Sequence, residues 1–206
     1  MPHRGNSVER RIPRLRLPIR GRRIELVLPA SDQIPSFVRL LNEPSVARWT
    51  LHMPYPYRER DGRDWVRRAG KGRRAGQALN LTIRRRSDEA ILGGAGIHQI
   101  SGDGSSAEVG YWLGKEYRGH GYAAEAVDLL ARSGFRRLGI HRLEALIFPA
   151  NAASRRLAQR CGFRYEGRLR DEVLKDGRWR ATLLYARIAS DPPPARRSTE
   201  LRVATA

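Results

Sequence analysis

The feature of the sequence that most constrains its fold is a strand, a glycine-rich turn and a helix in direct succession. The run from Glu108 to Leu113 (EVGYWL) is apolar and aromatic, which predicts a strand. Beyond the turn at 118–123 (RGHGYA), apolar residues recur at helical spacing as far as Leu138, and Gly139 is expected to end that helix. The first N–H groups of such a helix point outward unpaired, so the turn suits a phosphate or pyrophosphate.

The turn itself carries two glycines, Gly119 and Gly121. Without a Cβ, both can adopt positive φ and let a ligand approach the backbone closely. The turn lacks the Gly-Lys-Ser/Thr of a P-loop and the Gly-x-Gly-x-x-Gly spacing of a dinucleotide-binding fold. An ordinary strand-to-helix turn with no ligand is the alternative.

Several motifs in this chain resemble those of the GNAT N-acetyltransferase superfamily. Arg118-x-x-Gly121-x-Ala123 is similar to its acetyl-CoA pyrophosphate loop, and the segment 151–163 (NAASRRLAQRCGF) is similar to its Asn-x-x-Ser helix ending in Gly-Phe. The run 107–113 (AEVGYWL) resembles most the ribosomal-protein N-acetyltransferase (RimJ/RimL-like) branch. The motifs occur in the family's order and span roughly residues 24–188.

This resemblance implies an α/β fold, a single GNAT domain with a mixed, mostly antiparallel twisted sheet that is splayed at its centre and has helices on both faces. It implies transfer of an acetyl group from acetyl-CoA to a primary amine, in this branch a protein N-terminal amine such as that of a ribosomal protein. Two alternatives stay open: an N-acetyltransferase for a small amine, such as an aminoglycoside or polyamine, and a degenerate acetyl-CoA-binding module without activity.

The resemblance names Glu108 and Ser154 as catalytic candidates. Glu108 stands where histone-acetylating relatives carry a general base, and its alternative is an ordinary strand glutamate paired with a neighbouring Arg. Ser154 matches a serine whose hydroxyl lies near the CoA sulfur in the ribosomal-protein branch, and its alternative is a helix cap. Both residues argue against the inactive module.

The resemblance also implies a set of acetyl-CoA contacts. The strand should offer backbone groups to the pantetheine arm, with the Leu113 N–H near the thioester carbonyl, and Arg118 should face the phosphates. Asn151 would bind pantetheine or cap its helix. The complete set comprises Tyr111, Trp112, Leu113, Arg118, Gly119, His120, Gly121, Tyr122, Ala123, Asn151 and Ser154.

The acceptor side has fewer signals in the sequence. His98 is expected to point toward the acceptor cleft or to be an ordinary core histidine, and the segments 42–60 and 167–182 are expected to set acceptor choice. Four aromatic residues are candidates for lining that pocket or for core packing: Trp49, Tyr55, Tyr57 and Trp65. No metal-ligand spacing occurs, so no metal is expected.

Composition bounds the remaining questions. The chain has 206 residues, one cysteine, no apolar run long enough to span a membrane and no secretory signal, so we expect a cytoplasmic protein, either a monomer or a homodimer. The net charge of +19 is almost entirely arginine, which favours codon bias in a GC-rich genome over specific nucleic-acid or ribosome binding. Residues 1–23 are predicted to be a flexible basic arm and residues 189–206 a disordered tail rich in Pro and Arg, and we expect residues 1–20 and 192–206 to be dispensable for catalysis.

Overall fold

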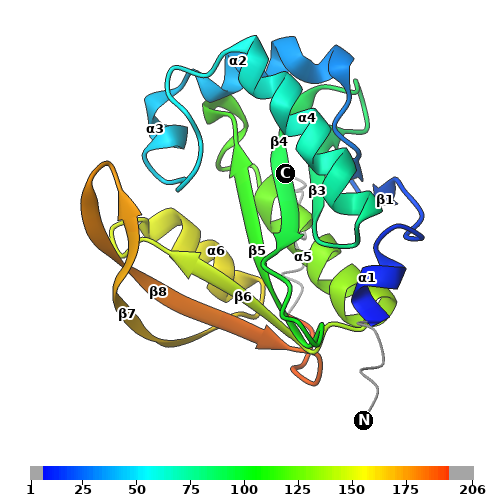
Figure 1. The fold of residues 1–206 in the computed structure, drawn as a ribbon, viewed down its shortest axis with the longest axis vertical. Coiled ribbons are helices and arrows are strands. Elements are labelled where there is room, and N and C mark those ends of the chain that lie inside the picture. Colours follow the sequence, from blue (N-terminus) through cyan, green and yellow to red (C-terminus); the bar gives the residue numbers. More distant parts are fainter. Residues whose placement is uncertain (1–6, 195–206) are drawn as a thin grey trace, which may run out of the picture.

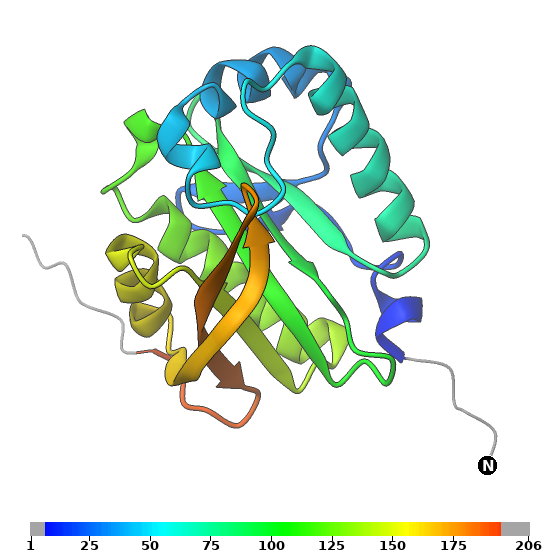
Figure 2. The same ribbon diagram turned by 60° about the vertical axis from the view of Figure 1, so that its left-hand side comes forward.

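The computed structural model describes residues 7–194, which form one eight-stranded sheet with helices packed against it (Figures 1 and 2). The strands are β1 (Ile19–Arg20), β2 (Ile24–Val27), β3 (Leu79–Arg85), β4 (Ile91–His98), β5 (Ser106–Leu113), β6 (Arg142–Ile147), β7 (Arg164–Lys175) and β8 (Arg178–Ile188). The helices are α1 (Ser7–Arg11), α2 (Ile34–Leu41), α3 (Pro44–Ala47), α4 (Glu59–Arg74), α5 (Tyr122–Ser133) and α6 (Ala152–Arg160). Shorter helical turns are η1 (Ser31–Gln33), η2 (Lys115–Tyr117) and the π-turn η3 (Gly134–Leu138).

The sheet is mixed and almost entirely antiparallel, in the order β1-β2-β3-β4-β5-β6-β8-β7. Its one parallel pair joins β5 and β6, and this pairing lasts for three residues, from Ser106 opposite Arg142 to Glu108 opposite Glu144. Beyond Glu108 the two strands diverge, so the sheet opens at its centre (Figure 1). The predicted fold class, including the central splay, is confirmed.

Helix α5 covers one face of the sheet, next to α6 (Figure 1). Its apolar stripe, which includes Val127 and Leu130, is buried in the main core. The helix continues through the π-turn η3 and ends at Gly139, whose φ of +80° suits glycine. The predicted end of the helix is therefore confirmed, whereas the π-turn was not foreseen.

Helices α2 and α4 cover the opposite face of the sheet and share a second, smaller core. Phe37 on α2 meets Trp65 on α4 edge-to-face, with ring centroids 4.7 Å apart. Trp112 of β5 packs against this core and lies across Gly94 of β4, where a Cβ would come within 2.5 Å of the indole Nε1. Gly94 therefore leaves room for the indole ring of Trp112.

The N-terminal segment corrects our prediction of a flexible arm. Residues 7–20 form α1 and β1, and β1 pairs with β2 at the edge of the sheet. The side chains of Val8, Ile12, Leu15 and Ile19 are at most 6% exposed and belong to the main core. The eight arginines and three prolines of residues 1–23 obscured an apolar residue recurring every three or four positions, which is an amphipathic pattern. The folded domain thus begins before residue 24.

The C-terminal hairpin is closed by a tight turn. Strands β7 and β8 turn at Asp176 and Gly177, which both have positive φ, as a two-residue hairpin turn requires. Of the predicted tail, Asp191 is held by the structure, because its carboxylate accepts the Ile188 N–H at 2.9 Å and lies 3.1 Å from the Arg164 guanidinium. The rest of that prediction, for residues 195–206, lies outside the described residues.

Within the described part of the chain, no helix is both long and apolar enough to cross a membrane.

The burial of Ile12 gives a test of the corrected N-terminus. We expect Ile12→Ala to lower the free energy of unfolding by about 2–4 kcal/mol, because it leaves a cavity in the main core. The measurement is denaturant unfolding followed by circular dichroism. Arg136→Ala, an exposed change on η3, is the control and should shift stability by less than about 0.5 kcal/mol. An unfolding midpoint for Ile12→Ala equal to that of the unaltered protein would restore the flexible-arm prediction.

Candidate active site

The glycine-rich turn forms an open cradle at the start of α5. Gly121 is the N-cap of the helix, with φ of +80°, and no side chain caps the first turn. Gly119 also has positive φ, +83°, and a Cβ built there would meet nothing within 4 Å. The N–H groups of the first turn are thus left for an anion, as the sequence predicted.

Arg23 completes this cradle, and our sequence analysis missed it by assigning it to the flexible arm. Its guanidinium donates to the His120 carbonyl at 2.9 Å and to Glu125 at 3.1 Å, and it lies 4.8 Å from the centre of the Tyr122 ring. The His120 and Tyr122 rings are neighbours, with centroids 6.0 Å apart, while Ala123 is buried beneath them. The Arg23 guanidinium therefore lies over the helix start, with Glu125 as its counter-charge.

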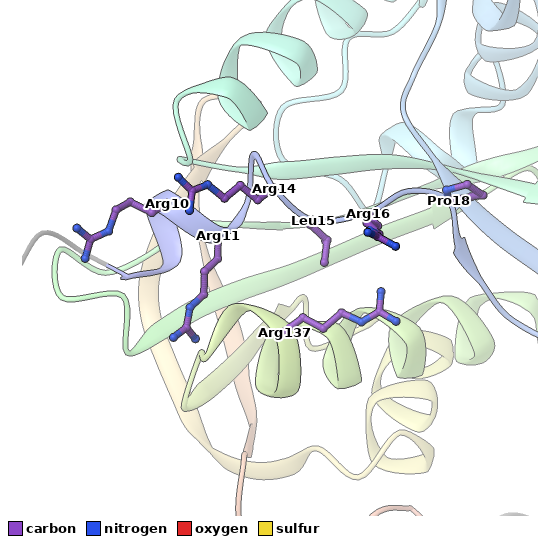
Figure 3. A pocket seen from close by; sticks show the side chains of 7 residues that line it. All are labelled: Arg10, Arg11, Arg14, Leu15, Arg16, Pro18 and Arg137. Atoms are coloured by element: carbon purple, nitrogen blue, oxygen red, sulfur yellow. The ribbon is translucent and has the colours of Figure 1, made fainter.

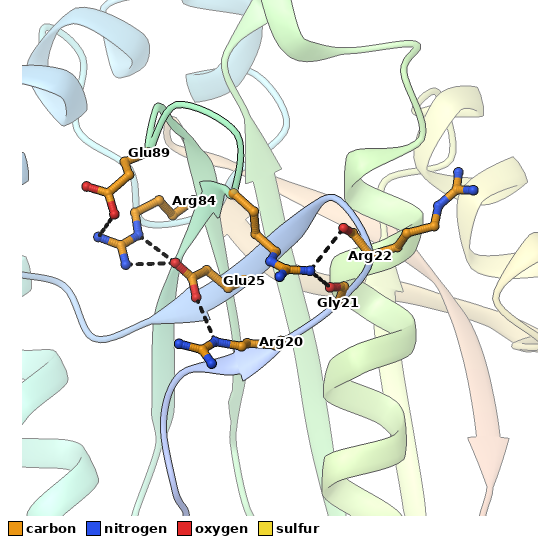
Figure 4. Close-up of polar contacts among 7 residues, drawn as sticks. Arg20, Gly21, Arg22, Glu25, Arg84 and Glu89 are labelled. Atoms are coloured by element: carbon orange, nitrogen blue, oxygen red, sulfur yellow. Dashed lines mark hydrogen bonds and ion pairs between the residues drawn. The ribbon is translucent and has the colours of Figure 1, made fainter.

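The turn that carries Arg23 is held by ion pairs and hydrogen bonds at the sheet edge (Figure 4). Glu25, nearly buried on β2, accepts from Arg84 at 2.7 Å and lies 3.5 Å from Arg20. Arg86 donates to the carbonyls of Gly21 and Arg22, at 2.9 and 3.2 Å. No sequence motif predicts that this turn lies beside Gly121. Its position is set by the pairing of β1 with β2 and of β2 with β3, which joins residues distant in the sequence.

Arg118 does not lie where we expected it. Its Nε donates to the Leu113 carbonyl at 3.2 Å and its Nη1 donates to Ser45 Oγ at 2.7 Å. The side chain thus ties the end of β5 to α3 and turns away from the helix start. Arg23 is the guanidinium that lies against the helix start in this structure.

The end of β5 presents its backbone to the opening in the sheet. The N–H of Gly114 donates to Leu92 of β4, and hydrogen bonding alternates along an antiparallel strand. The N–H groups of Tyr111 and Leu113 therefore face away from β4, toward the side where β6 has diverged. This is the arrangement expected for a ligand that binds like an added strand.

Ser154 and Tyr111 meet on the α6 side of this opening. Their hydroxyl oxygens lie 2.6 Å apart. Asn151 caps α6, because its Oδ1 accepts the Ser154 N–H at 3.1 Å, so the serine hydroxyl is not needed as a cap. Burial raises the pKa of Tyr111 to about 12, which keeps its O–H group protonated. Ser154 is therefore not the helix cap, which was its alternative interpretation. Asn151 is the cap, as its own alternative interpretation held.

Glu108 lies beside His98 on the adjacent strand β4. The carboxylate Oε2 and the imidazole Nδ1 are 4.0 Å apart, and Gly110 leaves room for the ring, since a Cβ there would come within 2.8 Å of Nε2. Burial, aided by Glu144 and Glu172, raises the pKa of Glu108 to about 7. Burial also lowers the pKa of His98, so the imidazole is neutral at pH 7 and the contact is not an ion pair. Among residues 7–194, no Arg side chain forms an ion pair with Glu108, so the alternative interpretation of this residue finds no support.

Glu108 and Ser154 lie on opposite sides of the sheet. Side chains alternate along β5, so Glu108 and Trp112 face α2 and α4, whereas Tyr111 faces α5 and α6. Beyond Glu108 the strands β5 and β6 diverge, so the sheet is open between these two faces next to this residue.

A cleft of about 520 Å³ lies next to this opening, between α3 and the β7–β8 hairpin. Arg48 and Trp49 form one wall, the segment 148–150 after β6 forms the floor, and the hairpin supplies the rest, which is Arg168, Asp171, Lys175, Asp176, Trp179, Arg180 and Ala181. The segments 42–60 and 167–182 thus meet, as expected of an acceptor site. Of the four candidate aromatics, Trp49 lines this cleft, while Trp65 and Tyr57 are core residues and Tyr55 is exposed.

Lys175 joins the two walls of the cleft and was not singled out in the sequence. Its Nζ donates to the carbonyls of Ala47, at the end of α3, and Thr50, just beyond it, at 3.1 and 2.9 Å. The side chain is 14% exposed, so the link is shielded from water. The hairpin is thereby fixed over the segment that follows α3.

The described residues contain no group of three or more His, Cys, Asp or Glu side chains placed to bind a metal ion.

A family model described as an acetyltransferase (GNAT) domain matches residues 23–164 of this chain. The chain belongs to the GNAT acetyltransferase family. It is 37% identical over 103 residues to the uncharacterized N-acetyltransferase p20 of Bacillus licheniformis, over 50% of this chain and 58% of the relative. It is 34% identical over 110 residues to the [ribosomal protein uS5]-alanine N-acetyltransferase of Escherichia coli, over 53% of this chain and 57% of the relative.

Among solved structures, Mycobacterium smegmatis RimJ in complex with CoA-disulfide has the same fold, with a TM-score of 0.75 and 25% sequence identity. That alignment covers 81% of this chain and 82% of RimJ. By sequence, the chain spans a little over half the length of the curated relatives it matches. The predicted family is confirmed by these matches.

The cradle gives a direct test for acetyl-CoA. We expect Gly121→Val to raise the Kd for acetyl-CoA about tenfold or more, since a β-branched residue is strained at φ of +80° and its Cβ would stand 3.2 Å from the Arg23 guanidinium. Isothermal titration calorimetry measures the affinity. Gly177→Val, at φ of +70° in the β7–β8 turn, is the matched control and should bind normally. Normal affinity in a folded Gly121→Val protein would show that the cradle does not hold the ligand.

Proposed function

We propose that this protein transfers the acetyl group of acetyl-CoA to the N-terminal amine of a protein, of the kind found in ribosomal proteins. The observation that supports this most is the opening between β5 and β6, which has an anion cradle and a serine hydroxyl on one side and a carboxyl of raised pKa on the other. Membership of the GNAT family supports the acetyl donor. A ribosomal-protein acceptor would place the reaction in the cytoplasm.

The residues around the opening fit acetyl-CoA. The start of α5 at 121–123 with Arg23 would hold the pyrophosphate, and the free backbone of Tyr111 and Leu113 would align the pantetheine arm. Acetyl-CoA supplies the acetyl group as a thioester, which is already activated toward an amine. The Leu113 N–H faces the opening and is available to a carbonyl oxygen.

Glu108 is suited to take the proton of the attacking ammonium. With a pKa of about 7, its carboxyl group is part ionised at neutral pH, which is the range in which a general base works best. The neutral His98 beside it adds no charge that would lower this pKa. The pKa of Glu108 is thus close to that of an α-amine, which is ordinarily about 8.

Ser154 is suited to stabilise the departing thiolate by donating a hydrogen bond to its sulfur. Its hydroxyl is free of capping, and Tyr111 holds it at 2.6 Å. Because Tyr111 stays protonated, its O–H can donate to Ser154 Oγ while the serine hydroxyl points into the opening. Tyr111 is then a positioning residue for the serine.

The cleft beside the opening favours a peptide over a small polycation. Its charged lining is four cations (Arg48, Arg168, Lys175 and Arg180) against Asp171 and Asp176. Such a lining repels an aminoglycoside or polyamine and attracts acidic residues behind a peptide N-terminus. Trp179 is 62% exposed at the rim, a large apolar surface of the kind that contacts protein partners.

A turnover assay with a panel of acceptors tests this function. Release of CoA is measured with peptides carrying a free N-terminus, with the same peptides blocked at the N-terminus, and with spermidine and an aminoglycoside. We expect free peptides to react, most of all those with acidic residues at positions two to six. Preference for the small amines would support the alternative substrate class. No turnover with any acceptor, despite acetyl-CoA binding, would support the inactive binding module.

Glu108 should set the pH dependence of the reaction. We expect kcat/KM to rise with pH through about 7, because only the ionised carboxylate accepts a proton. In Glu108→Gln this limb should disappear, leaving the lower activity that rises near pH 8 as the amine itself loses its proton. Glu144→Gln is the control: it removes a charge that raises the pKa of Glu108, so the limb should move to lower pH. An identical profile in all three proteins would exclude Glu108 as the base.

Ser154 and Tyr111 should affect the chemical step rather than binding. We expect Ser154→Ala to lower kcat by roughly tenfold to a thousandfold, the scale of one acid contribution, with little change in acetyl-CoA affinity. Tyr111→Phe should lower kcat by about tenfold or less, because it removes one hydrogen bond to the serine. The double variant should be no slower than Ser154→Ala alone, since the tyrosine acts through the serine. Additive effects of the two substitutions would contradict this dependence.

A further inference from the structure

A second anion-binding feature lies at the opposite end of α5. A groove of about 670 Å³ runs between the segment that follows α1 and the π-turn η3, and its lining includes five arginines: Arg10, Arg11, Arg14, Arg16 and Arg137 (Figure 3). Figure 3 shows Arg137 rising from the helix and the other four coming from the N-terminal segment that crosses above it. Nothing in the proposed acetyl transfer uses this groove.

The fold itself forces these arginines outward. Ile12 and Leu15 are anchored in the core, so the residues between and beside them must face solvent. The stretch 10–16 (RRIPRLR) therefore presents four guanidinium groups and no acid. Codon bias accounts for arginine in place of lysine, but it does not account for four arginines in seven residues at a concave surface.

Three of the five arginines carry no counter-charge in the described part of the chain. Among residues 7–194, no acidic side chain forms an ion pair with Arg14, Arg16 or Arg137. Arg11 donates to the Leu138 carbonyl at 3.1 Å, which leaves its charge in place. Like charges that are held close together raise one another's free energy, and a bound polyanion relieves this.

We propose that this groove binds the phosphate backbone of RNA. Guanidinium groups pair with phosphate through two hydrogen bonds at once, and no aromatic side chain in the lining could stack on a base, so recognition would be of the backbone and not of sequence. The choice of RNA as the polyanion rests on the proposed function, because a ribosomal-protein acceptor is assembled on RNA. A membrane surface is a poorer fit, because the apolar side chains of this segment, Ile12 and Leu15, are buried in the core.

The two anion sites can be occupied together. Helix α5 with η3 spans 17 residues from Tyr122 to Leu138, roughly 25 Å at 1.5 Å per residue. RNA in the groove would thus leave the glycine cradle free for acetyl-CoA. The groove would anchor the enzyme to an RNA-containing particle while the acceptor cleft samples protein termini.

Binding of a fluorescent RNA duplex of about 20 base pairs, followed by anisotropy between about 50 and 200 mM salt, tests the proposal. We expect Arg14→Ala/Arg16→Ala/Arg137→Ala to weaken RNA binding at least tenfold and to lower the salt slope by about two to three, because each phosphate that a protein neutralises contributes about 0.9 to that slope. The control, Arg60→Ala/Arg63→Ala/Arg67→Ala, removes the same charge from exposed, acid-paired positions on α4 and should weaken binding less than threefold. Circular dichroism checks that both variants fold.

Three outcomes would overturn the proposal: no RNA binding by the unaltered protein, an equal weakening in the two triple variants, or tighter binding of a DNA duplex of the same sequence. The assay contains no acetyl acceptor, so its result is independent of whether peptides are acetylated. In the proposal, acetylation of a free peptide by the groove variant is unchanged, while its co-sedimentation with ribosomes falls. Failure of peptide acetylation with intact RNA binding would contradict the proposed function and not the groove.

Discussion

The short parallel pairing between β5 and β6 is the constraint on which the rest of this structure depends. Three residue pairs hold the strands together, and beyond Glu108 they separate. A sheet normally keeps its two faces apart, because every backbone group along it is paired. Here β5 and β6 separate beyond Glu108, and Glu108 and Ser154 lie on opposite faces of the sheet.

The two faces differ in electrostatic character. On the α5 side, the helix start has no side-chain cap, and Arg23, which is paired with Glu125, lies against it. On the other side, Glu108 is buried near Glu144 and Glu172, and the removal of water together with the repulsion between carboxylates raises the pKa of its carboxyl group to about 7. In the proposed reaction, this division would keep the cation of one side from lowering the pKa of Glu108 on the other.

The N-terminal segment contributes to both ends of α5. Its apolar residues anchor it to the core, Arg11 reaches the carbonyl at the helix end, and the turn after β1 brings Arg23 over the helix start. Arg86 and Arg84 hold this turn through strand pairing at the sheet edge (Figure 4). A segment with the composition of a solvated arm is thus part of the domain, because four apolar residues at helical spacing outweigh its arginines.

The local features of this protein follow from its sequence: the strand, glycine turn and helix around Gly121, the hairpin turn at Asp176 and Gly177, and the serine at the start of α6. Each depends on residues within a few positions of one another, where backbone conformation follows from side-chain type. The partners of these features depend on the tertiary fold. Tyr111 meets Ser154, Glu108 meets His98 and Arg23 lies against the start of α5 because strand register and helix packing bring together residues that no sequence spacing connects.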